Sequence, residues 1–119
     1  MYNSKISGLG MYVPENVVTN HDLSEMMDTS NEWIIERTGI EERRHIKKGD
    51  GNSTVIMGVK ASKIAIERAG IDKNDIDLIL FATLSPDYYF PGSGVLAQEQ
   101  LGIPTCPAMD IRNQCSGFV

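Results

Sequence analysis

The chain has 119 residues, 41% hydrophobic and 23% charged, so we expect one modest folded domain and not a disordered chain. Eleven basic and sixteen acidic side chains give a net charge of −5, which argues against general binding of nucleic acid or anionic membranes. The two cysteines form no Cys-x-x-Cys pair and lie far from the histidines, so neither a disulfide scaffold nor a metal site is expected. No apolar run reaches the length of a membrane span and no signal peptide is evident, so a cytoplasmic protein with free thiols is expected.

The chain begins with a pattern typical of a strand, over Lys5–Val13. Gly8 and Gly10 inside this segment indicate a bulge or a close approach of another backbone. A short helix is expected over His21–Met27, with Asn20 as its N-terminal cap.

Two further helices have clear start and stop signals. Residues 29–32, Thr-Ser-Asn-Glu, fit a capping box that opens a helix through Arg37, and Gly39 suits its left-handed end. The longest helix is predicted over Ser53–Ala69, ending at Gly70. Most of its positions are apolar, so we expect it to be buried on most of its surface.

The second half of the sequence alternates strands and helices. Asp77–Thr83 is a continuous apolar run, which predicts a strand covered on both faces, as in a parallel sheet. An aromatic loop over residues 85–91 precedes a helix over Gly94–Leu101, and Ala108–Arg112 is predicted to be a short strand. This order of elements indicates a layered α/β fold. Because a strand that belongs inside a sheet lies so near residue 119, we expect the chain to be a fragment or one piece of a larger protein.

Cys115 is the strongest candidate for a chemical role. It follows the last predicted strand and precedes Ser-Gly-Phe-Val, a plausible helix start. A thiol at a helix N-terminus faces free amide donors that stabilise its thiolate, and Gly117 permits close backbone approach. The alternative is a buried, inert cysteine. Cys106, between two prolines, is interpreted as structural.

Two aromatic features are also candidate binding sites. Trp33 and Arg37 are four residues apart on one helix face, where an indole and a guanidinium could hold a purine and its phosphates. The alternative is a simple cation–π pair or a partly buried tryptophan. The Tyr88-Tyr89-Phe90 loop could line an apolar pocket or an interface, or it could equally fill a core.

Taken together, these residues resemble the β-ketoacyl-acyl-carrier-protein synthase III family of the thiolase superfamily. The matching blocks follow the order and approximate spacing of that family over nearly the whole chain. They are residues 28–34 (Asp-Thr-Ser-Asn-Glu-Trp-Ile), Arg37-Thr38-Gly39-Ile40 with Arg43, Ala69-Gly70-Ile71, Phe90-Pro91, and Asp110 through Cys115-Ser116-Gly117-Phe118.

The resemblance implies a role for five residues. Cys115 would be the nucleophile that carries the acyl group as a thioester. Trp33 would stack on the adenine of coenzyme A, with Arg37 and Thr29 near its nucleotide and phosphates. Phe90 would reach across a dimer interface into the acyl pocket of the partner.

The resemblance also implies a fold and an activity. The fold would be a thiolase-like layered αβαβα architecture with a mixed sheet, of which residues 1–119 would form the N-terminal half, ending just after the nucleophile. The activity would be the decarboxylating condensation of a short acyl-CoA, such as acetyl-CoA, with malonyl-acyl-carrier protein, which initiates fatty acid biosynthesis. A homodimer, acyl-CoA as substrate, acyl carrier protein as partner and no permanently bound cofactor are implied.

Two departures from the family pattern leave alternatives open. The family's His and Asn, which stabilise the enolate, belong to its second half, and here His21 and His45 both precede Cys115. We therefore expect this chain alone to be inactive, and a non-catalytic dimerisation and coenzyme A-groove half of a split enzyme is one alternative. Arg112-Asn113-Gln114 replaces small residues and Ser116 replaces a common alanine. These changes leave the acyl primer open and are compatible with an enzyme of polyketide or other specialised acyl condensation.

Overall fold

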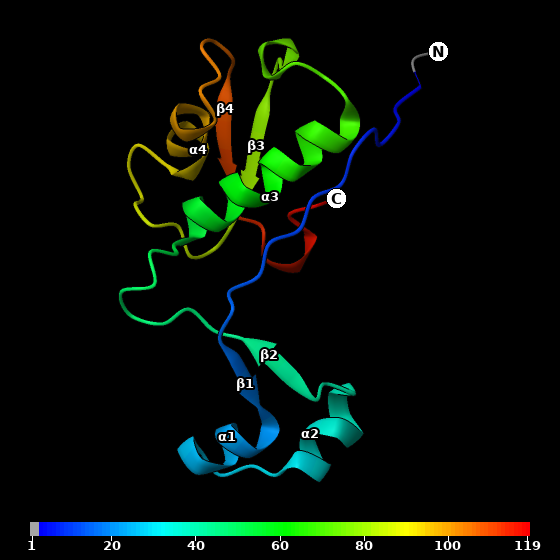
Figure 1. Ribbon diagram of the computed structural model, residues 1–119, viewed down its shortest axis with the longest axis vertical. Coiled ribbons are helices and arrows are strands. Elements are labelled where there is room, and N and C mark those ends of the chain that lie inside the picture. Colours follow the sequence, from blue (N-terminus) through cyan, green and yellow to red (C-terminus); the bar gives the residue numbers. More distant parts are fainter. Residues whose placement is uncertain (1–2) are drawn as a thin grey trace. The chain divides into compact units, whose positions relative to one another are not determined.

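The computed structural model describes residues 3–119, which divide into two compact units. One unit comprises residues 3–12 and Ser53–Val119, and the other is Val13–Asn52. Within the described residues, each unit contains one two-stranded sheet and two α-helices (Figure 1).

The larger unit is built on α3, Thr54–Ala69, which is the longest helix predicted from the sequence. Ser53 caps it, because its Oγ accepts a hydrogen bond from the Ile56 amide at 3.3 Å. Gly70 ends it at a φ of 65°, a left-handed conformation that glycine adopts without steric cost. Both predicted ends of this helix are therefore confirmed to within one residue.

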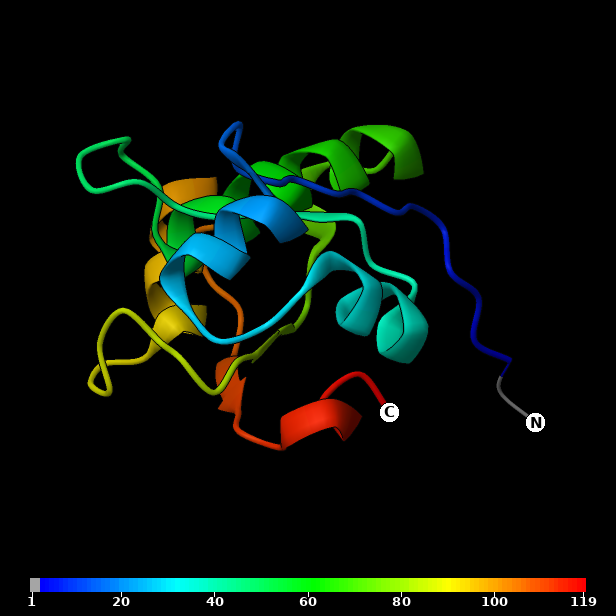
Figure 2. The same ribbon diagram turned by 90° about the horizontal axis from the view of Figure 1, so that it is seen from below.

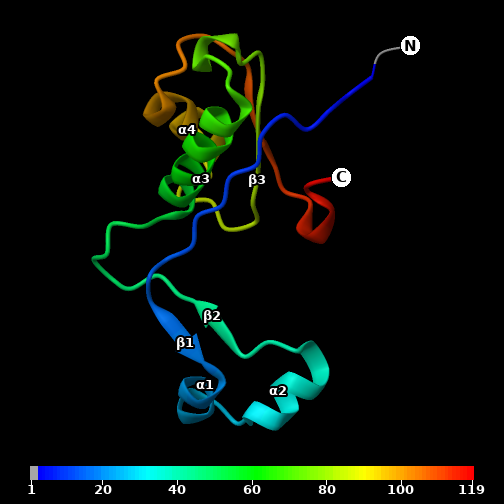
Figure 3. The same ribbon diagram turned by 45° about the vertical axis from the view of Figure 1, so that its right-hand side comes forward.

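The sheet of this unit consists of β3, Ile79–Ala82, and β4, Ala108–Ile111, which run parallel. Parallel neighbours need a crossover connection, and α4, Ser93–Leu101, lies in it. Figure 3 shows α3 and α4 on the same side of β3. The small core between them contains Val55 and Val59 of α3 and Ala97 of α4, with Phe81 of β3 packed against it.

The opposite face of the β3–β4 sheet is bare in the described residues. Leu80 of β3 is 54% exposed and its partner in the ladder, Met109 of β4, is 53% exposed. Side chains alternate between the two faces of a strand, so the same strand packs the partly buried Phe81 against the core and exposes Leu80. The prediction that Asp77–Thr83 is covered on both faces is therefore wrong for the described residues.

The N-terminal segment is not a strand, so the prediction over Lys5–Val13 is also wrong. A strand needs a neighbour for its backbone hydrogen bonds, and none of the described segments pairs with it. The segment is instead held by α3, where the Lys60 ammonium donates to the Tyr12 hydroxyl at 2.9 Å. A Cβ on Gly8 or Gly10 would run into backbone atoms of α3, so the predicted close backbone approach is confirmed.

The smaller unit combines an antiparallel pair of strands with two helices. The strands β1, Val17–Thr19, and β2, Glu42–Arg44, are each three residues long and were not predicted. The helices are α1, Asn20–Met26, and α2, Asn31–Thr38. Figure 2 shows them as separate coils joined by the extended segment 27–30.

The helix caps of this unit differ from the predicted ones by one residue. Thr19, and not Asn20, caps α1, and it exchanges hydrogen bonds with Asp22. Ser30 caps α2 by accepting a hydrogen bond from the Trp33 amide at 3.1 Å, whereas the predicted cap was Thr29. Gly39 ends α2 at a φ of 69°, as predicted.

Asn20 does not cap α1, and its side chain instead forms hydrogen bonds that connect the elements of the smaller unit. It is 1% exposed, and its amide nitrogen donates to the Ile40 carbonyl at 2.8 Å and to the Asn31 Oδ1 at 3.1 Å. The Arg43 guanidinium donates to the Asn20 Oδ1 at 2.7 Å. Buried polar groups need such partners, so this network links both helices to β2.

Candidate functional site

The candidate nucleophile lies on a turn directly after β4. Arg112 and Asn113 lead from the strand to a 3₁₀ turn, Gln114–Ser116, that contains Cys115. The position of the cysteine after a strand is as predicted, but the expected helix start is here only a single 3₁₀ turn. Cys115 is exposed, so the alternative of a buried, inert cysteine does not hold for the described residues.

The strand that leads to this turn is anchored by Asp110. Its two carboxylate oxygens accept hydrogen bonds from the Ser93 amide at 2.8 Å and the Gly94 amide at 2.7 Å. These amides belong to the first turn of α4, where backbone N–H groups have no helical partner and favour a negative charge. The end of β4, and with it the approach to Cys115, is thereby attached to the start of α4.

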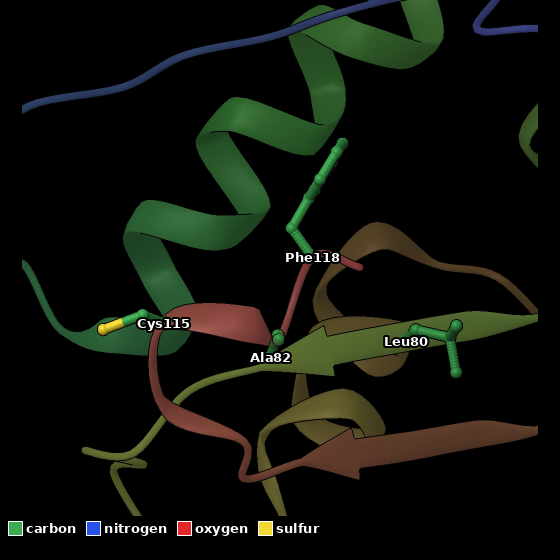
Figure 4. Close-up of a pocket in the computed structure, with 5 residues that line it drawn as sticks. Leu80, Ala82, Cys115 and Phe118 are labelled. Atoms are coloured by element: carbon green, nitrogen blue, oxygen red, sulfur yellow. The ribbon is translucent and has the colours of Figure 1, made fainter.

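A hollow of about 590 Å³ lies beside the turn, on the bare face of the sheet. Leu80 and Ala82 of β3 line it together with Cys115, Gly117 and Phe118. Figure 4 shows the sulfur of Cys115 pointing away from Leu80 and Phe118. The thiol is thus exposed to solvent.

The second candidate site is the face of α2 that carries Trp33 and Arg37. The Arg37 guanidinium lies 5.9 Å from the centre of the Trp33 ring, within the range of a cation–π contact. The Trp33 side chain is nevertheless 56% exposed, so it is not a core residue in the described structure. Thr29 and Trp33 line a shared hollow of about 330 Å³ with Asp28 and Ser30.

The third candidate, the aromatic loop after β3, is exposed along its length. Tyr88, Tyr89 and Phe90 are 65%, 79% and 90% exposed, so the alternative of a core plug is wrong for the described residues. Asp87 anchors the start of the loop on α3, because its carboxylate accepts from the Ser53 hydroxyl at 2.6 Å and the Thr54 amide at 2.9 Å.

Partial burial alone raises the pKa of Asp87, but hydrogen bonds outweigh it. The Ser53 hydroxyl and the Val55 and Thr54 amides stabilise the ionised carboxylate, so the pKa of Asp87 falls below its ordinary value of 3.8. Asp87 is therefore a charged cap of α3 at neutral pH.

The predicted site residues fall into the two units. Thr29, Trp33 and Arg37 gather in the smaller unit, on and just before α2. Cys115 and Phe90 belong to the larger unit, after β4 and after β3 respectively.

The sequence interpretation missed two carboxylates, Asp87 and Asp110, that attach the loop after β3 and the strand β4 to the starts of helices. It assigned no role to Asp87, and it treated Asp110 only as part of a matching block. No local sequence pattern could have found these contacts, because Asp87 lies 33 residues from Thr54 and Asp110 lies 16 residues from Gly94.

Known proteins resemble this chain in sequence and in fold. No family model matches it. A β-ketoacyl-acyl-carrier-protein synthase III 1 of Vibrio vulnificus is 54% identical over 117 residues, which are 98% of this chain and 36% of the relative. The crystal structure of a 3-oxoacyl-acyl-carrier-protein synthase III from Aquifex aeolicus VF5 matches with a TM-score of 0.91 at 44% identity, over 98% of this chain and 37% of that one.

A second solved structure, the priming β-ketosynthase of the R1128 polyketide pathway, matches with a TM-score of 0.89 at 33% identity. That match covers 96% of this chain and 34% of the other. The chain thus spans about a third of the length of the relatives that it matches. Because the sequence and fold matches agree, the predicted thiolase-like α/β fold is confirmed, and over nearly its whole length the chain is similar to about a third of the length of proteins named β-ketoacyl-acyl-carrier-protein synthase III.

Proposed function

We propose that this chain supplies the acyl-carrying cysteine of an enzyme that condenses a short acyl-CoA with malonyl-acyl-carrier protein. The observation that carries the proposal is the exposed Cys115 on the turn after β4, in a chain about half identical to proteins named β-ketoacyl-acyl-carrier-protein synthase III. The reaction would initiate fatty acid biosynthesis.

The chemistry divides into two steps that share one covalent intermediate. The Cys115 thiolate attacks the acyl carbonyl carbon, the bond from that carbon to the sulfur of coenzyme A breaks, and coenzyme A leaves as a thiolate that takes up a proton. Malonyl-acyl-carrier protein then loses CO₂, and the electron pair of the broken bond attacks the acyl carbon. The bond to the Cys115 sulfur breaks and the β-ketoacyl product leaves.

The second step needs hydrogen-bond donors for the developing enolate oxygen. The family resemblance places a His and an Asn in that role, outside these 119 residues. We therefore expect residues 1–119 to act as the N-terminal half of the enzyme and to be inactive alone.

Coenzyme A would bind to the smaller unit. The half-exposed Trp33 ring offers a flat surface for the adenine, and the adjacent Arg37 guanidinium offers a positive charge for phosphate. Thr29 lines the same hollow as Trp33 and would lie next to the nucleotide. The donor would be a substrate, and no permanently bound cofactor is needed for this chemistry.

Besides the acyl-CoA substrate, the enzyme would have two protein partners. One is acyl carrier protein, and the other is a second copy of the enzyme itself. Phe90 is 90% exposed, as expected of a side chain that enters the acyl pocket of a partner in a homodimer.

None of the helices in residues 3–119 is long and apolar enough to cross a membrane. We place the enzyme in the cytoplasm, where fatty acid synthesis has its substrates.

The direct test is acylation of Cys115. The complete protein that contains this sequence is incubated with acetyl-CoA, and intact-mass and peptide mass spectrometry follow the added acetyl group. We expect one acetyl group per chain, located on Cys115, and none in the Cys115→Ala variant. Cys106→Ala is the matched control and should label normally, since Cys106 is half-buried between prolines. Labelling that persists in Cys115→Ala would refute the proposal.

Specialised acyl condensation is the second candidate function. The likeness to a priming β-ketosynthase of a polyketide pathway and the unusual Arg112-Asn113-Gln114 segment favour it. Competition between acetyl-CoA and longer or branched acyl-CoA substrates for Cys115 separates the two functions. Preference for acetyl-CoA supports fatty acid initiation, and preference for a longer primer supports specialised condensation.

The same labelling experiment distinguishes part of a continuous enzyme from a non-catalytic half of a split enzyme. If residues 1–119 are only a dimerisation and coenzyme A-binding module of a split enzyme, Cys115 will be labelled only after the separate second half is added. A single continuous chain that is labelled without any addition rules out that alternative.

A further inference from the structure

The helix α2, which presents Trp33 and Arg37, has little packing of its own to hold it in place. It has eight residues, fewer than the roughly 12–15 that an isolated helix needs in water. Among these eight residues, all of them described, only Ile34 is buried. Trp33 is 56% exposed and Arg37 is exposed, so neither packs the helix against a core. The place of this face therefore depends on what holds the two ends of the helix.

One buried side chain contacts both ends of α2. The Asn20 Nδ2 donates to the Oδ1 of Asn31, the first residue of the helix, at 3.1 Å. The same nitrogen donates at 2.8 Å to the carbonyl of Ile40, which directly follows the C-cap Gly39. Asn20 is 1% exposed, so its hydrogen bonds are shielded from water. A helix held in this way cannot turn or slide without losing one of the two contacts.

Arg43 determines which way the Asn20 amide faces. Its Nη2 donates to the Asn20 Oδ1 at 2.7 Å, and its Nη1 donates to the Val18 carbonyl at 3.3 Å. A guanidinium can only donate, so the oxygen of the amide faces Arg43 and the nitrogen is left for the two ends of α2. Because Arg43 lies on β2, the group that holds the helix is attached to the sheet of the smaller unit.

We infer that Asn20, oriented by Arg43, is a positioning residue for the nucleotide of coenzyme A. It keeps α2 in the place where the Trp33 ring meets the adenine and the Arg37 guanidinium meets a phosphate. Asn20 touches no substrate itself and acts through these two side chains. The inference rests on the proposed binding of coenzyme A to α2, and it adds a residue that the sequence interpretation treated only as a helix cap.

A buried asparagine has a competing role, which is general stability of the smaller unit without any effect on the nucleotide. Two acetyl donors separate the roles, because acetyl-CoA and S-acetyl-pantetheine carry the same thioester and only acetyl-CoA carries a nucleotide. Loss of folded protein lowers kcat/KM for both donors by the same factor. Displacement of α2 lowers kcat/KM for acetyl-CoA alone, so the ratio of the acetyl-CoA value to the S-acetyl-pantetheine value falls.

The test measures this donor ratio for the complete protein and for Asn31→Ala, at a fixed concentration of malonyl-acyl-carrier protein. The variant removes one of the two contacts at an exposed position, so the unit should still fold. We expect the donor ratio to fall by about three- to tenfold, up to the effect of losing one stacked base. Asn31→Asp keeps an oxygen that accepts from Asn20 and should retain most of the ratio. Thr19→Ala, which removes the cap of α1 in the same unit, is the stability control and should leave the ratio unchanged.

The network is also tested from its other members, so that the result does not depend on one variant. Asn20→Asp keeps the shape but places a carboxylate oxygen against the Asn31 oxygen and the Ile40 carbonyl, so it should lower the donor ratio at least as much as Asn31→Ala. Arg43→Met removes the donors that orient the amide and should lower the ratio in the same direction. The double variant Asn31→Ala/Trp33→Ala should add little to Trp33→Ala, because the contact acts through that ring.

An unchanged donor ratio in both Asn31→Ala and Arg43→Met would overturn the inference, as would an equal loss with both donors. In either case acetylation of Cys115 would persist and the proposed function would stand. A complete protein whose Cys115 accepts acetyl from neither donor would refute the proposed function itself, and the inference with it.

Discussion

At the scale of single residues, two carboxylates connect distant segments of the larger unit. Asp110 of β4 and Asp87 of the loop after β3 each accept hydrogen bonds from amides in the first turn of a helix, which the helix leaves free. Caps such as Ser30 and Ser53 make hydrogen bonds within their own helix start, and sequence patterns placed both helix starts to within one residue. Asp87 caps a helix whose first residue lies 33 positions earlier, and no local pattern predicts that pairing.

Replacement of Asp87 tests how much this single carboxylate contributes to stability. Asp87→Ala removes the acceptor for the Thr54 and Val55 amides, so we expect a loss of about 1–2 kcal/mol in the free energy of unfolding at pH 7, as for other helix caps. Because the pKa of Asp87 is lowered in the folded protein, its stabilising effect is present above its ordinary pKa of 3.8 and is lost as the pH falls through the lower folded value.

The measurement is denaturant unfolding of the complete protein and of the variant between pH 3 and pH 7. The difference in the free energy of unfolding between the two proteins should be constant near neutral pH and become smaller in acid. Asp77→Ala is the matched control, since the described residues supply no hydrogen bond to that exposed carboxylate. A difference that does not depend on pH would contradict the charged role of Asp87.

At the scale of elements, local signals predicted the helices well and the strands less well. The helices α2, α3 and α4 end at Gly39, Gly70 and Gly102, all with positive φ, as their positions in the sequence predict. The N-terminal segment was predicted to be a strand but lies against α3 without strand pairing. Its glycines nevertheless serve the predicted purpose of close backbone approach.

Gly10→Ala tests the contact between this segment and α3. The added Cβ would overlap the Ala61 carbonyl oxygen and lie 2.7 Å from the Ala65 amide nitrogen, and both are backbone atoms of a helix that cannot shift easily. We expect a loss of about 1–3 kcal/mol, as for other overpacked sites, measured by denaturant unfolding of the complete protein. Ser7→Ala, at an exposed position of the same segment, should change stability little. Equal stabilities of the two variants would show that the segment does not pack as described.

At the scale of the whole molecule, the two units carry different parts of the proposed chemistry. The larger unit presents the thiol of Cys115, and the smaller one presents the Trp33 and Arg37 face. The larger unit also leaves one face of its sheet uncovered among the described residues, where Leu80 and Met109 are half-exposed. The chain spans about a third of the length of its relatives.

Trp33→Ala tests the part assigned to the smaller unit. Stacking of a base on an aromatic ring contributes about 1–3 kcal/mol, so the KM for acetyl-CoA should rise roughly tenfold or more while kcat changes little. Trp33→Phe should raise the KM for acetyl-CoA by a smaller factor, because phenylalanine keeps an aromatic ring. Glu36→Gln, an exposed position on the same helix, serves as the control. A fall in kcat with an unchanged KM would assign Trp33 to the reaction step and contradict a role in nucleotide binding.

The sequence by itself determined the features that depend on neighbours along the chain. These are the three helices with their glycine ends, the cysteine that follows a short strand, and the pairing of Trp33 with Arg37 on one helix face. Helix hydrogen bonds join residues four positions apart, so a short segment contains all the information needed.

Only the tertiary structure decided what the segments pack against. The strand hydrogen bonds of β3 are made to β4, the carboxylate of Asp87 reaches α3, and Arg112 meets Tyr89, each across at least twenty residues of sequence. Whether an apolar strand is covered on one face or on two depends on which other segments are present, and an alternating strand exposes whatever they leave uncovered. The position of Cys115 was therefore predictable, whereas the contacts that hold its turn were not.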